Sequence, residues 1–360
     1  MLAASNDSSK ITVDFTSSRG LSDFLTAHQI SIAVSTYQSG NLFLIGPSAD
    51  DGLHVKSVVL ERPMGVCVDG DSLFVGGLYQ VYRFNNVLPP GVRHEGADKL
   101  YTPTVSWTTG EIDCHDLTVE SSGRIVFVNT MHSCLATVSL QESFIPLWKP
   151  PCISKLEPED RCHLNGLALR DGKVRYASAF SRTDTSSGWR ENKDNQGVIW
   201  DITTNQVVVE NLSMPHSPRW HEESLWLLDS GSGALGYADL SKKAFCPVLK
   251  IPGYLRGLTF HGRYALVGSS VPREKSSIED ARILTQLAAD KREAYCGLVI
   301  VDLQSGELAH WIRITGDIQE IFDIAVIPNV QAADGIGLRD DRIKYVLKVG
   351  VEPFNGKGRG

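Results

Sequence analysis

Short apolar runs, each broken by a polar turn, recur along the chain and predict β-strands rather than helices. Five segments follow one order: a polar or histidine-bearing start, an apolar strand, a turn of Gly, Asp, Glu or Ser, and a second apolar strand. They are RPMGVCVDGDSLFVGG, DCHDLTVESSGRIVFVN, CHLNGLALRDGKVRYAS, MPHSPRWHEESLWLLDSG and GYLRGLTFHGRYALVGSS. The repetition predicts one structural unit that is used several times.

Aligning the ends of the first strands places five residues at one equivalent position, which we call the shared position: Met64, His115, Asn165, His216 and Arg256. The intervals between them are 51, 50, 51 and 40 residues. A repeat of about 40 to 50 residues that carries four strands is typical of a β-propeller blade. The sequence therefore predicts five complete blades.

The two ends of the chain supply the parts of a sixth blade. QEIFDIAVIPN reads as a first strand without following partners, whereas ISIAVSTYQSGNLFLIGP reads as following strands without a first strand. We predict that residues near 321–327 pair with strands near 31–46, because closing the ring removes exposed sheet edges. The predicted fold is all-β: a six-bladed propeller at 25–330, an N-terminal extension at 1–24 and a C-terminal tail at 331–360.

Helical periodicity is confined to two segments. SSRGLSDFLTAH near the start predicts one short helix. SSIEDARILTQLAADKREA, at residues 276–294, carries apolar residues at helical spacing and predicts a helical insertion in the loops of the sixth blade.

Composition narrows the class of protein. The chain has 360 residues, is 42% hydrophobic and 21% charged, and carries a net charge of −7 without a sustained Lys/Arg cluster. Nucleic acid and anionic membranes are therefore not expected as partners. No apolar stretch approaches the roughly 20 residues of a membrane helix, and the first residues lack a signal-peptide pattern, so we expect a cytoplasmic protein. The seven cysteines, without a C-x-x-C pair, favour reduced thiols. The oligomeric state stays open.

Reactive side chains at the shared position should lie close together, because the innermost strands of a propeller surround one channel. His115, Asn165, His216 and Arg256 converge on one mouth of it, and the period of two along a strand keeps His163 on the same side as Asn165. His115, His163 and His216 predict a site for a divalent transition metal, Zn, Fe or Cu, with a position open for water or substrate.

Other side chains complete this hypothesis. Asp116, Glu320 and Asp323 are candidate catalytic acids that complete the metal shell or accept a proton. Asn165, Arg219 and Arg256 are candidate substrate-binding residues, the arginines for a carboxylate. Two alternatives remain open: each histidine satisfies buried backbone groups at a strand start, or Asp116 orients His115 as a general base. The segment FSRTDTSSGWREN, with Trp189 and Arg190, is either a surface loop or a loop folded over the site.

Several runs carry a resemblance over residues 25 to 330. They are TTGEIDCHDL, FVNT, SCLATVS, LWKPPCISKL, DRCHLNGLALRDG, SMPHSPRW, LWLLDSGSG, PGYLRGLTF and CGLVIVDL. The chain resembles an uncharacterised family of bacterial conserved hypothetical proteins, sometimes joined to tetratricopeptide or sulfotransferase modules. The resemblance implies that His115, Asp116, His163, Asn165, His216, Arg219 and Arg256 belong to the family's motifs. It implies no activity. His132 stands where the family has a large apolar residue, which favours a packing role.

Two classes of function follow from these observations. The first is a metal-dependent enzyme acting on a small polar or peptidic substrate at the channel mouth, as a lyase, a hydrolase or a peptide-modifying oxidoreductase. The alternative is a non-catalytic propeller that binds a peptide or a partner protein. No G-x-G-x-x-G, P-loop, G-x-S-x-G or H-E-x-x-H motif is present, which disfavours dinucleotide chemistry, nucleotide hydrolysis and the usual serine hydrolase plan.

Overall fold

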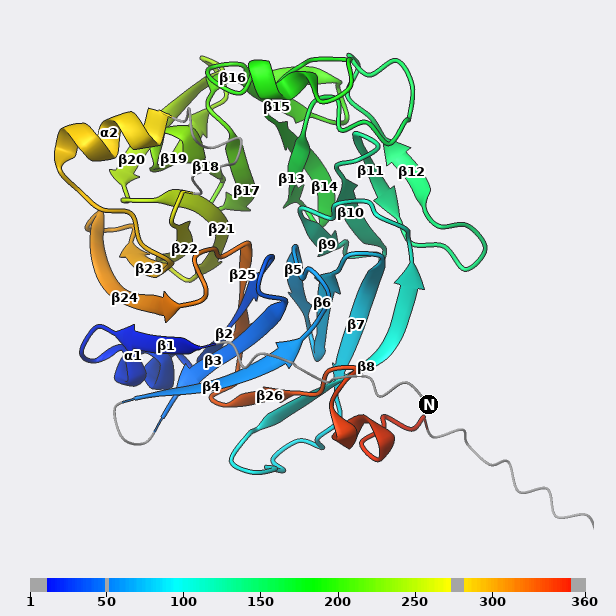
Figure 1. The fold of residues 1–360 in the computed structure, drawn as a ribbon, viewed down its shortest axis with the longest axis vertical. Coiled ribbons are helices and arrows are strands. Elements are labelled where there is room, and N and C mark those ends of the chain that lie inside the picture. Colours follow the sequence, from blue (N-terminus) through cyan, green and yellow to red (C-terminus); the bar gives the residue numbers. More distant parts are fainter. Residues whose placement is uncertain (1–11, 49–51, 273–281, 351–360) are drawn as a thin grey trace, which may run out of the picture.

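A computed structural model describes residues 12–48, 52–272 and 282–350, and its six sheets are arranged in a ring around a central axis (Figure 1). The fold is the predicted six-bladed β-propeller. Five blades follow one another along the chain, each running from its innermost to its outermost strand. They are β5 (Val66–Asp69), β6 (Ser72–Gly76), β7 (Gln80–Asn86), β8 (Lys99–Thr108); β9 (Leu117–Val119), β10 (Ile125–Asn129), β11 (Cys134–Thr137), β12 (Ile145–Trp148); β13 (Leu164–Arg170), β14 (Lys173–Ala179), β15 (Gly197–Asp201), β16 (Gln206–Leu212); β17 (Pro215–His221), β18 (Ser224–Asp229), β19 (Ala234–Asp239), β20 (Ala244–Lys250); and β21 (Tyr254–His261), β22 (Tyr264–Ser270), β23 (Gly297–Asp302), β24 (Glu307–Gly316).

The sixth blade joins the two ends of the chain, as predicted. Its innermost strand is β25 (Asp323–Pro328), followed by β2 (Ile30–Thr36), β3 (Asn41–Pro47) and β4 (Leu53–Val59). The pairing of β25 with β2 is antiparallel and continuous, from Asp323 opposite Ser35 to Pro328 opposite Ile30. This closure is confirmed at the level of register.

Segments outside the predicted propeller limits extend two blades. β1 (Val13–Ser17) pairs with β24, and β26 (Ala333–Gly335) pairs in parallel with β8. The first predicted helix is α1 (Leu21–His28). The second is α2 (Arg282–Asp290), while residues 276–281 of that prediction lie outside the described residues. α2 lies between β22 and β23, in the blade that carries Arg256, so its predicted place in the sixth blade was wrong.

Three short 3₁₀ turns complete the described elements: η1 (Gly188–Glu191), η2 (Ser230–Ser232) and η3 (Asp341–Lys344). In the described ranges, neither α-helix has the length and apolar character needed to cross a bilayer.

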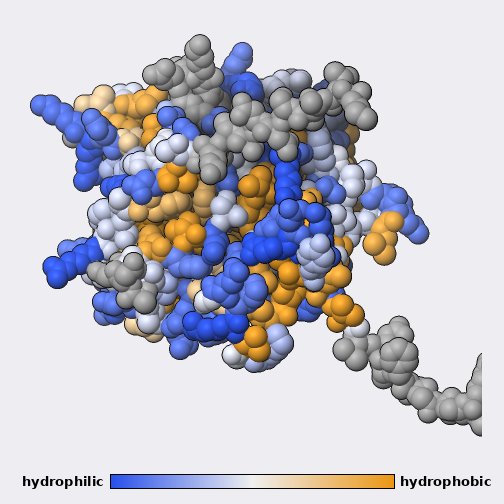
Figure 2. Space-filling model, turned by 60° about the horizontal axis from the view of Figure 1, so that its bottom comes forward, coloured by the Kyte–Doolittle hydropathy of each residue, from blue (hydrophilic) through white to orange (hydrophobic). Residues whose placement is uncertain are grey.

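The hydrophobic core lies within and between the blades. Ile32 and Ile324 of the closing blade are fully buried in one apolar cluster with Leu298 and Ile312 of the neighbouring blade. On the face that Figure 2 presents, hydrophobic residues are interspersed with hydrophilic ones. The burial of these contacts between blades holds the ring together.

Around the axis, the residue after the shared position alternates between glycine and a polar side chain. The six residues are Gly65, Asp116, Gly166, Ser217, Gly257 and Asp323. At the glycines, neighbouring strands approach closely: a Cβ on Gly65 would lie 2.9 Å from the Cα of Asp116, and one on Gly166 would lie 2.4 Å from the Cδ of Pro218. Only glycine fits such an approach.

The three polar members bind the next strand instead. The Asp116 carboxylate accepts a hydrogen bond from the Leu167 amide at 3.1 Å, and the Asp323 carboxylate accepts one from the Val66 amide at 2.9 Å. The Ser217 hydroxyl accepts one from the amide of Gly257 at 3.1 Å. Adjacent innermost strands are therefore joined alternately by close packing and by a side chain.

Candidate functional site

A pocket of about 250 Å³, which we call the mouth pocket, opens where the innermost strands begin. It contains three of the predicted site residues, His115, His163 and Arg256, and a sixth residue of the shared position, Phe322. The full lining is Tyr37, Asp113, His115, Asp160, His163, Phe180, Trp189, Arg190, Tyr254, Arg256 and Phe322. Aromatic rings thus surround a small group of titratable side chains.

His115 is fixed as a neutral imidazole. Its Nδ1 lies 2.9 Å from the Asp113 carbonyl oxygen and 2.8 Å from the Thr130 hydroxyl, which itself donates to the Leu164 carbonyl at 2.7 Å. Nδ1 is therefore the donor, and the lone pair is on Nε2. Burial lowers the pKa of His115 to about 4, against an opposing effect of Asp113. At neutral pH this side chain offers an acceptor to the mouth pocket.

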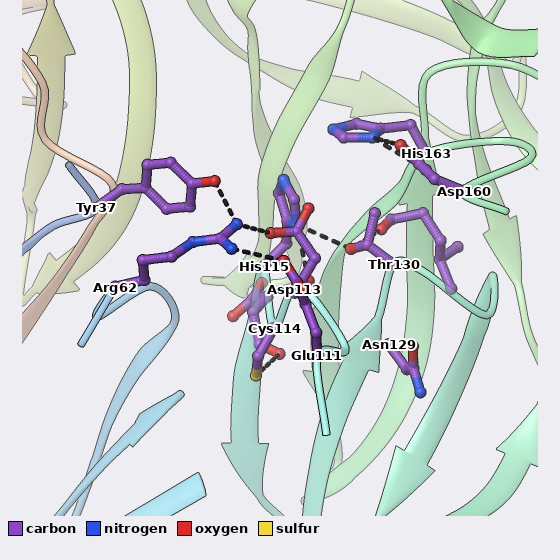
Figure 3. Close-up of polar contacts among 12 residues, drawn as sticks. Tyr37, Arg62, Glu111, Asp113, Cys114, His115, Asn129, Thr130, Asp160 and His163 are labelled. Carbon is purple, nitrogen blue, oxygen red and sulfur yellow. Dashed lines mark hydrogen bonds and ion pairs between the residues drawn. The ribbon is translucent and has the colours of Figure 1, made fainter. Parts of the chain in front are cut away.

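His163 stands beside His115 and is held by an acid. Its Nδ1 lies 2.9 Å from one oxygen of the Asp160 carboxylate, and the Trp189 indole donates to that oxygen at 2.7 Å. The ring centroids of His163 and His115 are 4.7 Å apart, edge to face. In Figure 3 the two imidazoles reach into the same space. Burial acts to raise the pKa of Asp160, but the donors His163 and Trp189 outweigh it, and the pKa is lowered.

His216 has the same kinds of hydrogen-bond partner as His115 but does not line the mouth pocket. Its Nδ1 lies 3.0 Å from the Met214 carbonyl oxygen and 2.9 Å from the Ser230 hydroxyl. Burial, followed by the charge of Arg256, places the pKa of His216 well below its usual value. The rings of Phe180 and Tyr254 pack against the imidazole, with centroids 5.2 and 5.5 Å away. His216 is therefore covered by aromatic rings that line the pocket.

The three predicted histidine ligands are not gathered into one metal centre. His115 and His163 are in contact, while the ring neighbours of His216 are Phe180 and Tyr254. In the described part of the chain, no three His, Cys, Asp or Glu side chains form a group that could hold a metal ion. The geometry gives no support to a three-histidine centre, and metal binding stays a prediction.

Arg256 and Glu320 meet at the edge of the mouth pocket. Arg256 Nη1 donates to the Glu320 carboxylate, and the guanidinium lies 5.1 Å from the Tyr254 ring centroid and 4.9 Å from that of Phe322. Arg256 thus faces the channel mouth, as its repeat position predicts. Glu320, a predicted catalytic acid, is bonded to this arginine.

Arg219, Asp116 and Asp323 form a separate buried ion cluster. Arg219 Nη1 donates to Asp116 at 2.7 Å, and Nη2 lies 3.8 Å from Asp323. Arg219 and Asp116 line a second pocket of about 250 Å³, formed by all six innermost strands and distinct from the mouth pocket. The structure does not bring these three residues to the histidines. β17 has a bulge between His216 and Arg219, and the two acids bind backbone amides of the next blade.

Burial in this cluster also changes protonation. It raises the pKa of Asp323 to about 7, with a further contribution from Asp116, while Arg219 acts in the opposite direction. The Asp323 carboxyl is therefore partly protonated near neutral pH.

Several residues of the mouth pocket were not predicted as site residues. Asp160 and Trp189 hold His163, and Arg190 stacks on Trp189 with 4.6 Å from its Cζ to the ring. Arg190 is exposed and forms no ion pair with any residue that the structure describes. The segment 180–192 folds over the site, one of the two alternatives that the sequence left open. The sequence feature that indicated a loop over the site was the pair Trp189 and Arg190 in a polar segment.

The sequence of residues 19–350 matches a family described as a domain of unknown function (DUF4915), and the chain belongs to this family. No curated protein matches it. Among solved structures it is similar to a chain of the nidogen/laminin complex, with a TM-score of 0.54 and 9% identity over 83% of this chain and 99% of that one. A virginiamycin B lyase from Staphylococcus aureus has a TM-score of 0.41 and 10% identity over 84% of this chain and 99% of that one. At 9% identity the likeness to the nidogen/laminin chain shows the fold alone.

Proposed function

We propose that this member of the DUF4915 family is an enzyme that moves a proton on a small polar substrate held in the mouth pocket. One observation carries the proposal: His115 and His163 are in contact, and each has its Nδ1 engaged by a protein acceptor. Both Nε2 atoms are then left for a ligand. Paired imidazoles with fixed tautomers are more than strand-start packing requires.

His163 takes the role of general base. Its Nε2 accepts a proton from the substrate or from a water molecule beside it, and the Asp160 carboxylate stabilises the imidazolium that forms. His115 stays neutral, because its pKa is about 4, and accepts a hydrogen bond that orients the substrate. Lyase and hydrolase chemistry both begin with such a step.

The lining of the pocket favours a small ligand with a negative charge. Arg190 and Arg256 supply the cations, and Phe180, Trp189 and Tyr254 supply apolar walls. The aromatic rings lie inside the mouth, in a volume of about 250 Å³, which favours a small molecule over the alternative of a peptide or protein platform. A divalent metal held by the Nε2 atoms of His115 and His163, with water completing its shell, is the metal-dependent form of the same proposal.

The test is a turnover screen with matched variants. Small hydroxy acids, their esters and their lactones are offered to the wild type, to His163→Gln and to Asp160→Asn. We expect kcat/KM to fall about 100-fold or more in His163→Gln, the usual contribution of a general base, and less in Asp160→Asn. His94→Gln, at an exposed histidine outside the pocket, is the control.

Two outcomes decide the proposal. Turnover that survives in His163→Gln, or binding of these compounds by the wild type without turnover, would leave the non-catalytic alternative. Metal analysis of the untagged protein, with and without a chelator, separates the metal-dependent form from direct proton transfer.

A further inference from the structure

Four charged side chains line the mouth pocket, and two of them are balanced by a partner outside its lining. The four are Asp113, Asp160, Arg190 and Arg256. The Asp113 carboxylate lies 3.4 Å from Arg62 Nη2, and Arg256 donates to the Glu320 carboxylate. A carboxylate and a guanidinium in contact present little net charge to a ligand beside them. The charge that the pocket offers to a ligand therefore comes from the other two side chains.

Asp160 is a buried carboxylate that is not balanced by a cation. Its side chain is 13% exposed and accepts hydrogen bonds from His163 Nδ1 at 2.9 Å and from the Trp189 indole at 2.7 Å. In the described ranges it pairs with no Lys or Arg. With a neutral imidazole, Asp160 and His163 together carry one negative charge and present Nε2 as an acceptor. This end of the pocket favours a positively charged donor.

His115 adds a second acceptor at the same end. The ring centroids of His115 and His163 are 4.7 Å apart, and in Figure 3 both imidazoles reach into one space. The Nδ1 of His115 is engaged by the Asp113 carbonyl and the Thr130 hydroxyl, so Nε2 is its acceptor. Two neighbouring acceptors fit a group that has more than one hydrogen to donate. An ammonium group has three and carries the charge that Asp160 favours.

Arg190 supplies the opposite charge a short distance away. Its Cζ lies 4.6 Å from the Trp189 ring centroid, and the His163 ring centroid lies 4.2 Å from that indole. Both groups therefore lie against one side chain, and both line the same volume of about 250 Å³. Arg190 is exposed and has no ion pair among the described residues. A guanidinium of this kind binds a carboxylate through two parallel hydrogen bonds.

We propose that the mouth pocket binds a small zwitterion, with its ammonium group at His115 and His163 and its carboxylate at Arg190. The chemical class is a free α-amino acid, in which one carbon atom separates the two charged groups. A dicarboxylate would bring negative charge to the acceptors in front of Asp160, and a diamine would bring positive charge to Arg190. A hydroxy acid has one O–H, without charge, where the amino acid has three N–H. The inference rests on the proposed function, because it names the substrate class of the same pocket.

The test compares three probes that share a carboxylate: alanine, lactate and propionate. We expect calorimetry to give alanine an affinity about 10-fold or more above that of lactate, because hydrogen bonds to charged groups contribute more than neutral ones. Propionate, which has no donor in this position, should bind most weakly. The titrations contain a chelator, so that no metal ion holds the amino group.

Two variants test the two ends of the ligand separately. Asp160→Asn removes the negative charge but keeps an oxygen for the Trp189 indole, so the affinity for alanine should fall to within about twofold of lactate. Arg190→Gln should weaken all three acids by a similar factor. Asp171→Asn and Arg182→Gln make the same chemical changes at exposed residues outside the pocket and should alter no affinity.

Nitrogen-15 NMR of labelled histidines is a second measurement, and it needs no variant. Alanine should move the Nε2 resonances of His115 and His163, and propionate should change them far less. Equal affinities for the three acids would overturn the proposal, as would failure of alanine to bind with both resonances unmoved. Loss of turnover in His163→Gln together with equal binding of the three acids refutes this inference alone. A preference for alanine with turnover intact in that variant refutes the proposed function alone.

Discussion

His115 and His216 are equivalent residues with equivalent support. In both cases Nδ1 donates to the carbonyl two residues earlier and to a hydroxyl, Thr130 or Ser230, that binds the next blade. Burial lowers both pKa values. Protonating these imidazoles costs free energy in the folded state, where they are buried, but not in the unfolded chain. Their protonation therefore lowers the stability of the fold.

Acid should destabilise the protein through His115. Its pKa is about 4 in the folded state and about 6.5 in the unfolded chain. The unfolded state therefore binds the proton first, and stability is lost as the pH falls from about 6.5 toward 4. His115→Asn, which keeps a donor for the Asp113 carbonyl, should flatten the pH dependence of the urea-unfolding free energy in this window. His94→Asn is the control, and an unchanged slope in His115→Asn would contradict the argument.

Asp323 should change the free energy of unfolding with pH in the opposite direction to His115. Its pKa is raised to about 7, above the value of about 3.9 in an unfolded chain. Its contribution is fully present below pH 4 and is lost as the pH rises through 7. Asp323→Asn, which stays neutral and keeps one oxygen acceptor, should gain stability relative to the wild type between pH 4 and 8. Asp171→Asn, at a carboxyl that is 92% exposed, should show no such trend in the same unfolding series.

The structure corrects the grounds on which two site residues, His163 and Arg219, were placed from the sequence. His163 was placed by the period of two along a strand, yet it precedes β13, has a φ of 51°, and reaches the pocket from a loop. Arg219 was grouped with the histidines, but the bulge after His216 changes the direction of the side chains that follow. Bulges and loop paths depend on contacts between blades, and a single strand pattern does not contain them.

At the scale of strands, the repeated pattern was readable because each blade uses the same turn and strand order. The alternation of glycine and polar residues around the axis was also present in the sequence, at Gly65, Gly166 and Gly257. Its meaning depends on knowing that the next strand lies against each glycine. Sequence alone predicts a turn from such residues.

Gly257 should be intolerant of a side chain. Its φ is 76°, and a Cβ would lie 2.8 Å from the amide nitrogen of Ile324 in β25. Gly110 has a similar φ of 74° with no atom within 4 Å of its Cβ, so Gly110→Ala isolates the cost of the backbone conformation. We expect Gly110→Ala to lower the unfolding free energy by about 1 kcal/mol, and Gly257→Ala to lower it by a further 1–3 kcal/mol, roughly the cost of overpacking. Equal effects in denaturant titrations would argue against close packing of β21 on β25.

For the whole molecule, closure of the ring was the most secure prediction. One end of the chain has a first strand without partners, and the other end has following strands without a first strand. Pairing them leaves no exposed sheet edge between them, and β25 pairs with β2 in this way. The place of α2 was less determined, because a helical insertion can enter any loop without changing the order of strands. The amphipathic pattern predicted a helix, but only the structure shows which blade contains it.

Closure implies that the six blades unfold as one unit. Ile327 of β25 is fully buried in a cluster that joins the closing blade to Val66 and Leu73 of the next blade. Ile327→Ala should lower the unfolding free energy by about 2–5 kcal/mol, the usual cost of this truncation in a core. Leu308→Ala on β24, at a side chain that is 51% exposed, should cost far less. Tryptophan fluorescence and circular dichroism should give coincident transitions for both variants. A separate early transition in Ile327→Ala would mean that the closing blade opens by itself, and that the ring does not depend on its two ends for cooperativity.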